Sequence, residues 1–228
     1  MTQPSTEAMS RVAEAALEMV QDGMRLGLGT GRAAEALIRA LGARVAAGLK
    51  VSGVATSQRS DALARSLGIT LATIDELPEL DLAFDGADEF TEGLELTKGL
   101  GGALLRERVV ASAAARFIVL VTPEKCVERL GTRAPIPVEV VPFAVGAVER
   151  GLRRLGAEPT LRRAADGSVY RTDNGNPILD ARVAPIVSPR ELHAAIRELP
   201  GAIDTGLFLG MADVVLVGAE AVERLERR

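Results

Sequence analysis

Residues 24–42 read MRLGLGTGRAAEALIRALG and carry the pattern of a strand, a tight turn and a helix. The apolar run Met24–Leu28 predicts a short strand, and the glycines of Gly29-Thr30-Gly31 predict a sharp turn after it. The next apolar side chains recur at the spacing of one helical face, namely Ala34, Leu37, Ile38 and Leu41. We expect this helix to end at Gly42, because glycine is common just past a helix C-terminus.

The same alternation continues on both sides of this segment. A helix is expected from Glu7 to Val20, before the first strand. Later strands are expected at 49–55, 69–74, 82–84 and 117–121, and later helices at 58–67 and 102–115. Apolar strands that alternate with helices favour a parallel sheet with helices on both faces. The sequence therefore predicts an α/β protein: a mostly parallel sheet flanked by helices, with a Rossmann-like core and an inserted smaller α+β domain.

The pattern changes beyond the last of these strands, where APIPVEVVP (134–142) carries three prolines in nine residues. Proline cannot donate a hydrogen bond to a neighbouring strand, so this segment suits a crossover or an edge strand. A capping box with Ser188 as N-cap predicts a helix further on. We expect residues 133–205 to form the small α+β domain. Residues 1–132 plus 206–228 should form the catalytic α/β domain, with a short helix at its end.

Composition limits the classes of function. The 228 residues carry a formal net charge of −4 and only 3% aromatic residues, which argues against nucleic-acid binding by a basic surface or by stacking. No apolar run approaches the roughly 20 residues that a membrane span needs, and the N-terminus lacks the pattern of a secretory signal. A cytoplasmic location is therefore expected. One cysteine and one histidine cannot supply a typical nitrogen or sulfur metal site, so we expect neither metal nor cofactor.

Polar groups gather at the ends of several predicted strands. The glycine-rich turn before Arg32 presents backbone N–H groups and a helix N-terminus, which together favour an anion. The segment FDGADE (84–89) places three acids after a strand, and Lys98 precedes the glycine-rich turn that opens the helix of Glu107. Lys125 follows the next strand. Because the carboxyl ends of parallel strands share one edge of a sheet, we expect these groups to surround one crevice.

Each of these features has an alternative interpretation. The turn at 29–31 could close a strand–helix unit without a ligand, and acidic turns are often only solvated. Glu107 could be favoured by the helix dipole alone, and Lys125 could be an ordinary surface residue. A magnesium ion on Asp85 and Asp88 also stays open, although the nearby lysines disfavour it. Taken together, the set favours an anionic sugar that undergoes proton transfer.

Several motifs resemble the A-type ribose-5-phosphate isomerase family over nearly the whole chain. They are GLGTG at 27–31, TSQRS at 56–60, FDGADE at 84–89, KGLGGALLRE at 98–107, IPVEV at 136–140, TDNGN at 172–176 followed by ILD, and GLF at 206–208. The resemblance implies an aldose–ketose isomerase that interconverts D-ribose 5-phosphate and D-ribulose 5-phosphate through an enediolate, in the non-oxidative pentose phosphate pathway. It also implies a homodimer or homotetramer whose partner is a small sugar phosphate, with no metal.

The resemblance assigns roles to residues of this chain. Glu107 is implied to be the catalytic base, with Asp85, Asp88 and Lys98 as its companions in the site. The implied substrate-binding residues lie in three turns and after one strand: Thr30, Gly31, Arg32, Ala33, Gly86, Ala87, Gly99, Leu100, Gly101 and Lys125.

Two departures from the family pattern bear on the substrate. Arg32 and Ala33 stand where the family has a hydroxyl pair, and Leu100 stands where glycine is common. We hypothesise that Arg32 takes over phosphate contact by paired hydrogen bonds, with altered substrate preference as the alternative. Two other classes of function stay open: a sugar-phosphate sensor without turnover, and a related enzyme such as an amino-sugar phosphate deaminase or an acyl-CoA transferase. The deaminase would need a catalytic histidine, and His193 is poorly placed for that role.

Overall fold

The computed structural model describes residues 6–227, which form two compact units. The first unit is built from three stretches of chain: the described residues up to Ala87, Arg106–Cys126, and the described residues from Met211 onward. The second unit is built from two stretches: Asp88–Leu105 and Val127–Gly210. Relative to the expected division, the second unit also takes residues 88–105, 127–132 and 206–210. The division into a catalytic and a smaller domain stays a prediction.

A seven-stranded sheet forms the framework of the first unit, in the order β14-β13-β7-β4-β1-β2-β3. Its strands are β1 (Arg25–Leu28), β2 (Ser52–Ala55), β3 (Thr70–Leu71), β4 (Leu80–Gly86), β7 (Ala114–Val121), β13 (Val214–Gly218) and β14 (Val222–Glu226). Neighbouring strands are parallel except β14, which runs antiparallel to β13. The predicted α/β class with a mostly parallel sheet is confirmed.

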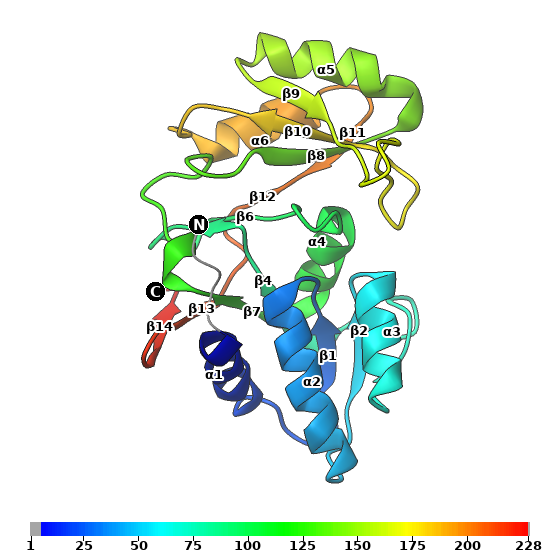
Figure 1. Cartoon of the computed structure of the whole chain (residues 1–228), viewed down its shortest axis with the longest axis vertical. Coiled ribbons are helices and arrows are strands. Elements are labelled where there is room, and N and C mark those ends of the chain that lie inside the picture. Colours follow the sequence, from blue (N-terminus) through cyan, green and yellow to red (C-terminus); the bar gives the residue numbers. More distant parts are fainter. Residues whose placement is uncertain (1–5, 228) are drawn as a thin grey trace. The chain divides into compact units, whose positions relative to one another are not determined.

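Helices cover both faces of this sheet. They are α1 (Thr6–Leu17), α2 (Arg32–Ala46), α3 (Gln58–Ser66) and α4 (Leu104–Ala113). α1 and α2 lie side by side (Figure 1), and their apolar residues pack with Leu26 and Leu28 of β1. Successive residues of a strand face opposite sides. Gly27 therefore faces the other way, where an added Cβ would lie 2.5 Å from Val110 of α4. None of the helices in the described part of the chain is long and apolar enough to span a membrane.

The order of the strands reverses beside β1. From β1 the chain passes through α2 to β2, which pairs with β1 in parallel. The chain later returns as β4, which pairs with the opposite edge of β1. In open α/β sheets, ligands bind outside the carboxyl ends of the strands at such a reversal. We therefore expect a functional site just beyond the carboxyl ends of β1 and β4.

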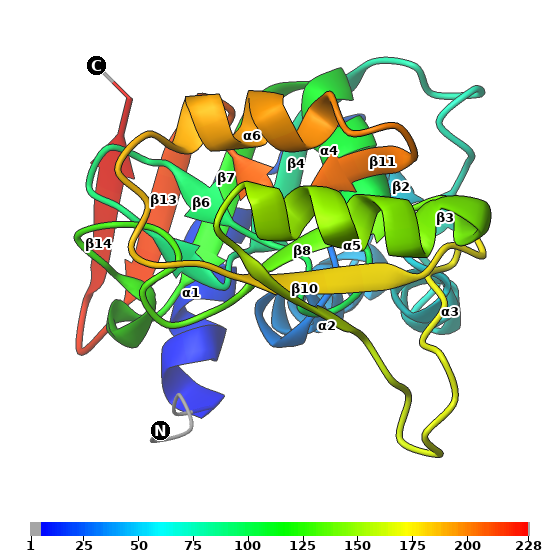
Figure 2. The same cartoon turned by 90° about the horizontal axis from the view of Figure 1, so that it is seen from above.

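The second unit contains two antiparallel sheets. The larger has the order β11-β8-β10-β9 and consists of β8 (Ile136–Val140), β9 (Glu158–Leu161), β10 (Ile178–Arg182) and β11 (Ala202–Thr205). The smaller has the order β12-β6-β5 and consists of β5 (Glu89–Phe90), β6 (Leu96–Thr97) and β12 (Leu207–Phe208). Helices α5 (Val145–Arg154) and α6 (Pro189–Arg197) accompany the larger sheet (Figure 2). Ser188 precedes α6 as expected, but its side chain makes no capping hydrogen bond, so the predicted capping box is wrong.

The two faces of the four-stranded sheet differ in character. Four aliphatic side chains of β8 and β10 pack with α5 and α6: Val138, Val140, Leu179 and Ala181. Because neighbouring residues alternate between faces, Pro137, Glu139 and Asp180 point to the second face. This second face therefore carries two carboxylates that the helices α5 and α6 do not cover.

Three expectations about individual elements are wrong. α2 continues past Gly42, because that glycine packs against Leu67, whose Cβ lies 2.7 Å from where a Cβ of residue 42 would stand. The segment after β13 is the strand β14 rather than a helix, since it pairs with the edge of β13. β8 lies inside its sheet rather than at an edge. Proline is tolerated there because the register with β11 ends at Val138, and on that side the Pro137 carbonyl still accepts the N–H of Gly206 at 2.7 Å, a bond that needs no N–H from proline.

Candidate active site

Asp85 lies at the carboxyl end of β4, beside the turn that links β1 to α2. Its Oδ1 accepts hydrogen bonds from the backbone N–H of Thr30 at 3.1 Å and of Gly86 at 2.8 Å. Asp85 is only 3% exposed. Backbone N–H donors stabilise a buried carboxylate, because they complement its charge without a counterion. The predicted site residues Asp85, Gly86 and Thr30 thus come together at the point where the strand order reverses.

Gly29 allows this turn to approach the carboxylate. Its N–H donates to the carbonyl of Phe84 at 2.8 Å. A Cβ on Gly29 would lie 2.3 Å from Cγ of Asp85, well inside van der Waals contact. Any side chain at this position would displace either the turn or the carboxylate, so glycine is needed here for close approach.

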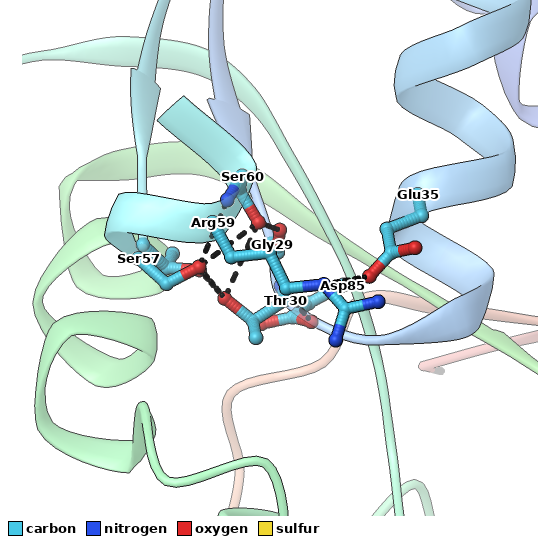
Figure 3. Close-up of polar contacts among 8 residues, drawn as sticks. Gly29, Thr30, Glu35, Ser57, Arg59, Ser60 and Asp85 are labelled. Carbon is cyan, nitrogen blue, oxygen red and sulfur yellow. Dashed lines mark hydrogen bonds and ion pairs between the residues drawn. The ribbon is translucent and has the colours of Figure 1, made fainter. Parts of the chain in front are cut away.

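Four hydroxyl groups join the β1–α2 turn to the β2–α3 turn (Figure 3). Oγ1 of Thr30 lies 2.7 Å from Oγ1 of Thr56 and donates to Oγ of Ser57 at 2.8 Å. Ser57 also caps α3 by accepting from the N–H of Ser60 at 3.1 Å. The Ser60 hydroxyl donates to the carbonyl of Gly29 at 2.6 Å. Sequence reasoning identified Thr30 and missed its three partners, although the TSQRS motif that contains them was visible.

The N-terminus of α2 opens at the same turn. Gly31 is the N-cap with φ of 104°, a left-handed conformation that favours glycine, and no side chain caps the helix. Ala33 is buried, whereas Arg32 is exposed. Arg59 of α3 pairs with Glu35 of α2 at 2.8 Å and ties the two helices together (Figure 3). The first N–H groups of α2 and the exposed guanidinium of Arg32 are suited to an anion.

Two further predicted residues of the first unit lie on other elements. Glu107 is in the first turn of α4 and is 4% exposed. A carboxylate there interacts favourably with the positive end of the helix. Lys125 ends the single-turn helix η1 (Pro123–Lys125), just after β7, and is half-buried. Ala87, after β4, is also half-buried.

Asp88 and the turn that follows Lys98 come together in the second unit. Oδ2 of Asp88 accepts from the N–H of Leu100 at 3.0 Å, and the N–H of Asp88 donates to the carbonyl of Thr97 at 2.7 Å. Lys98 is 3% exposed, and its ammonium lies 5.6 Å from the ring centre of Phe208. That distance is within the range of a cation–π contact.

The backbone around Lys98 is held closely. Its N–H donates to the carbonyl of Gly206 at 2.8 Å, and a Cβ on Gly206 would lie 2.2 Å from the carbonyl oxygen of Lys98. Gly99 has φ of 99°, which disfavours any other residue. Leu100 is 44% exposed, so its side chain meets no steric barrier. This exposure explains why leucine is accepted where glycine was expected, and Gly101 beside it is exposed as well.

Glu89, the last acid of FDGADE, is a structural carboxylate. It is fully buried, and its Oε2 accepts from the N–H of Gly131 at 2.7 Å while Oε1 accepts from the N–H of Ala134 at 3.0 Å. It therefore anchors the loop before β8. No local pattern in the sequence separates Glu89 from Asp85 and Asp88.

The two groups of residues contain the parts that proton transfer needs: buried carboxylates, a buried ammonium, and turns lined by N–H and hydroxyl groups. Among residues 6–227, no three side chains of His, Cys, Asp or Glu are arranged so that they could hold a metal ion.

Comparison with known proteins gives consistent matches. The family model described as ribose 5-phosphate isomerase A (phosphoriboisomerase A) matches residues 52–221. The ribose-5-phosphate isomerase A of Roseiflexus sp. (strain RS-1) is 50% identical over 218 residues, which cover 94% of this chain and 94% of that protein. The protein of the same name from Thermomicrobium roseum is 50% identical over 222 residues, with 97% and 94% covered.

Solved structures agree. Ribose 5-phosphate isomerase A from Methanocaldococcus jannaschii matches with a TM-score of 0.92 at 41% identity, covering 96% of this chain and 98% of that one. A D-ribose-5-phosphate isomerase in complex with phospho-erythronic acid matches with a TM-score of 0.95 at 37% identity, covering 99% and 100%.

Proposed function

Since this chain belongs to the ribose-5-phosphate isomerase A family, we propose how its residues carry out the reaction of that family. The enzyme interconverts D-ribose 5-phosphate and D-ribulose 5-phosphate. Membership decides against the sensor, deaminase and transferase alternatives. The observation that most supports a catalytic site is burial: Asp85, Lys98 and Glu107 are 3%, 3% and 4% exposed. Ionisable groups are costly to bury, and those that are buried concentrate at functional sites.

Glu107 is the general base of this proposal. Isomerisation moves a proton between C2 and C1 of the open-chain sugar through an enediolate, so a base must remove a weakly acidic proton from carbon and return it to the neighbouring carbon. A carboxylate can serve both steps, and general-base catalysis contributes roughly 10²–10⁴-fold. Burial of Glu107 supports this role, because buried ionisable groups concentrate at functional sites.

Lys98, Asp85 and Asp88 assist the base. The ammonium of Lys98 stabilises the carbonyl oxygen as it gains charge in the enediolate, an effect of a few kcal/mol in sites of this kind. Asp85 and Asp88 move hydroxyl protons and open the furanose ring. The backbone bonds that hold each carboxylate support the idea that both are fixed before substrate arrives.

The phosphate group binds at the β1–α2 turn in this proposal. Thr30 supplies a hydroxyl, Gly31, Arg32 and Ala33 supply N–H groups of the helix start, and Lys125 supplies a further cation. The uncapped N-terminus of α2 supports this assignment, because its first N–H groups have no side-chain acceptor. The remaining substrate contacts come from the other two turns: Gly86, Ala87, Gly99, Leu100 and Gly101.

An assay of ribulose 5-phosphate formation tests the activity itself. Purified protein should convert ribose 5-phosphate with and without EDTA at the same rate. Absence of turnover in both samples would contradict the isomerase assignment. Loss of turnover only with EDTA would agree with the isomerase assignment but would show that the reaction needs a metal ion.

Glu107→Gln tests the base. This change keeps the shape of the side chain but removes the group that accepts the proton, so kcat should fall by roughly 10²–10⁴-fold while substrate still binds. Binding is measured by calorimetry. Glu92→Gln, at an exposed glutamate, is the matched control and should leave kcat unchanged. A Glu107→Gln enzyme with near-normal kcat would rule out this role.

We also propose that the enzyme is a homodimer or homotetramer and acts in the cytoplasm, where its phosphorylated and therefore membrane-impermeant substrate is held. Sedimentation equilibrium of the purified protein measures the first, and a monomer at micromolar concentration would contradict it. Fractionation of cells that express the chain measures the second.

A further inference from the structure

The turn that carries Lys98 lies on the second face of the four-stranded sheet, inside the second unit. A Cβ on Gly99 would lie 3.3 Å from Cβ and Cγ of Pro137, which points to that face. Asp180 is the register partner of Pro137 on the neighbouring strand β10. The turn therefore rests beside the carboxylate of Asp180, and a group that bridges the two could fix the turn.

Arg162, directly after β9, makes that bridge. Its Nη1 donates to the carbonyl oxygens of Gly99 at 3.0 Å and Leu100 at 3.1 Å. Its Nε donates to Oδ2 of Asp180 at 2.8 Å, and Nη2 donates to Oδ1 of the same carboxylate. One planar guanidinium thus holds a carboxylate with one edge and two consecutive carbonyls with the other, an arrangement that lysine cannot reproduce.

Tyr170 packs against the same guanidinium. The centre of the Arg162 guanidinium lies 5.6 Å from the ring centre of Tyr170, and the Tyr170 hydroxyl lies 3.5 Å from the carbonyl oxygen of Gly101. A Cβ on Gly102 would lie 2.0 Å from that hydroxyl, so Tyr170 also needs glycine at this position. The side chains of Arg162 and Asp180 are 12% and 21% exposed, which limits solvent screening of their ion pair.

We propose that Arg162 is a positioning residue of the isomerase, which holds the Gly99–Leu100 backbone and so fixes the two groups attached to it. One is Lys98, which directly precedes the bound carbonyls. The other is Asp88, which accepts the N–H of Leu100. This inference rests on the proposed roles of Lys98 and Asp88. It adds that their alignment depends on a cation contributed by a strand end more than 60 positions further along the chain.

The expected consequence is a loss of rate that exceeds the loss of affinity. Displacement of a catalytic group by about 1 Å can cost on the order of 10²-fold in rate. The Gly99–Leu100 backbone is itself among the proposed substrate contacts, so a change at Arg162 should also raise KM, but by less than it lowers kcat.

Arg162→Lys tests the inference, because lysine keeps the charge beside Asp180 but cannot bind the carboxylate and both carbonyls together. We expect kcat to fall by about 10- to 100-fold, with a smaller rise in KM. The matched control is Arg163→Lys, the neighbouring arginine, which is exposed and donates only to the carbonyl of Gly167 among the hydrogen bonds described. The control should keep the wild-type kcat.

Thermal unfolding separates positioning from a structural role. If Arg162→Lys lowers the unfolding temperature but the folded enzyme keeps its kcat, the inference is wrong. Asp180→Asn provides a second variant in case Arg162→Lys does not fold. It leaves the two carbonyl bonds and weakens only the anchor of the guanidinium, so kcat should fall by roughly threefold. Wild-type kcat in every folded variant of this pair would overturn the inference.

Lys98→Met distinguishes the inference from the function on which it rests. If Lys98→Met is inactive while the Arg162 and Asp180 variants have normal kcat, the role of Lys98 stands and that of Arg162 falls. If Lys98→Met keeps full activity, the proposed role of Lys98 is wrong, and the part of the inference in which Arg162 positions Lys98 is wrong with it.

Discussion

Arg32 is part of one of the two departures from the family pattern that the sequence shows, and this departure predicts a change in substrate affinity. Its guanidinium is exposed at the uncapped start of α2. A hydrogen bond to a charged group contributes about 1.5–3 kcal/mol, so Arg32→Ala should raise KM for ribose 5-phosphate by roughly 10- to 100-fold with little change in kcat. Steady-state kinetics measure both constants.

Arg39→Ala is the control for that measurement. Arg39 is also exposed and lies on the same helix, two turns further from the candidate site. Its removal changes the net charge by the same amount, so any effect of overall charge on substrate capture appears in both variants. Equal KM values for the two variants would show that Arg32 does not contact the phosphate.

Tyr170 gives a direct optical measure of its own surroundings, since the chain has no other tyrosine and no tryptophan. Burial raises the pKa of Tyr170 above its ordinary value. The nearby Arg162 charge lowers that pKa, and the carboxylates of Asp173 and Glu139 raise it. Tyrosinate absorbance in the folded protein should therefore appear at higher pH than in denaturant, and Arg162→Gln should move it higher still.

The same shift has a consequence for stability. A residue whose pKa is raised on folding contributes stability that is complete below its ordinary pKa and is lost as pH rises through the raised value. The contribution of Tyr170 is thus present at neutral pH and lost in the alkaline range. A folded-state titration at or below the ordinary tyrosine pKa would contradict this account.

The sequence identified site residues where local pattern carries the information. Asp85 and Thr30 follow strands of one parallel sheet, and the structure brings them within hydrogen-bond distance. Arg162 and Asp180 were missed, because their contacts with Gly99 and Leu100 join segments that nothing in the local pattern connects. Long-range side-chain contacts of this kind depend on strand register, and a single sequence does not reveal register.

Helix caps provide a test at two helices that both begin after a serine. Ser57 accepts the N–H of Ser60 at the start of α3, whereas Ser188 makes no such bond at the start of α6. Ser57→Ala should lower the free energy of unfolding by about 1 kcal/mol, and Ser188→Ala should change it by much less. Chemical denaturation measures both. If both variants lost the same free energy of unfolding, the capping hydrogen bond of Ser57 would not contribute to stability.

Helices and strands were predicted well where the spacing of apolar residues determines them. They were predicted poorly where contacts with distant parts of the chain determine them. The strand before Gly29 and the helix after it follow directly from their apolar spacing. The helix α2 nevertheless runs past Gly42, because contact with Leu67 matters more there than the intrinsic tendency of glycine to end a helix. The residues of β14 suit a helix. They form a strand instead, because the backbone N–H and C=O groups of β13 need hydrogen-bond partners and β14 supplies them.

The first unit as a whole depends on its last strand. Removal of the residues after Gly218 would delete β14 and leave β13 as an unpaired edge of buried, apolar residues. We expect the truncated protein to lose roughly 1.5–3 kcal/mol of stability and to aggregate on warming, as light scattering would show. Val222→Ala is the control: it removes packing against the core but keeps the ladder, so it should destabilise without aggregation. A truncated protein that stays clear on warming would contradict this expectation.

Strand β7 lies in the middle of its sheet, between β4 and β13, yet β13 comes from the far end of the chain. During synthesis, β7 is therefore made about 90 residues before its second neighbour. At usual elongation rates of about 5–20 residues per second, the nascent chain carries this hydrophobic strand half-covered for roughly 5–20 s. The order of segments along the chain thus creates an interval in which a chaperone has a defined strand to shield.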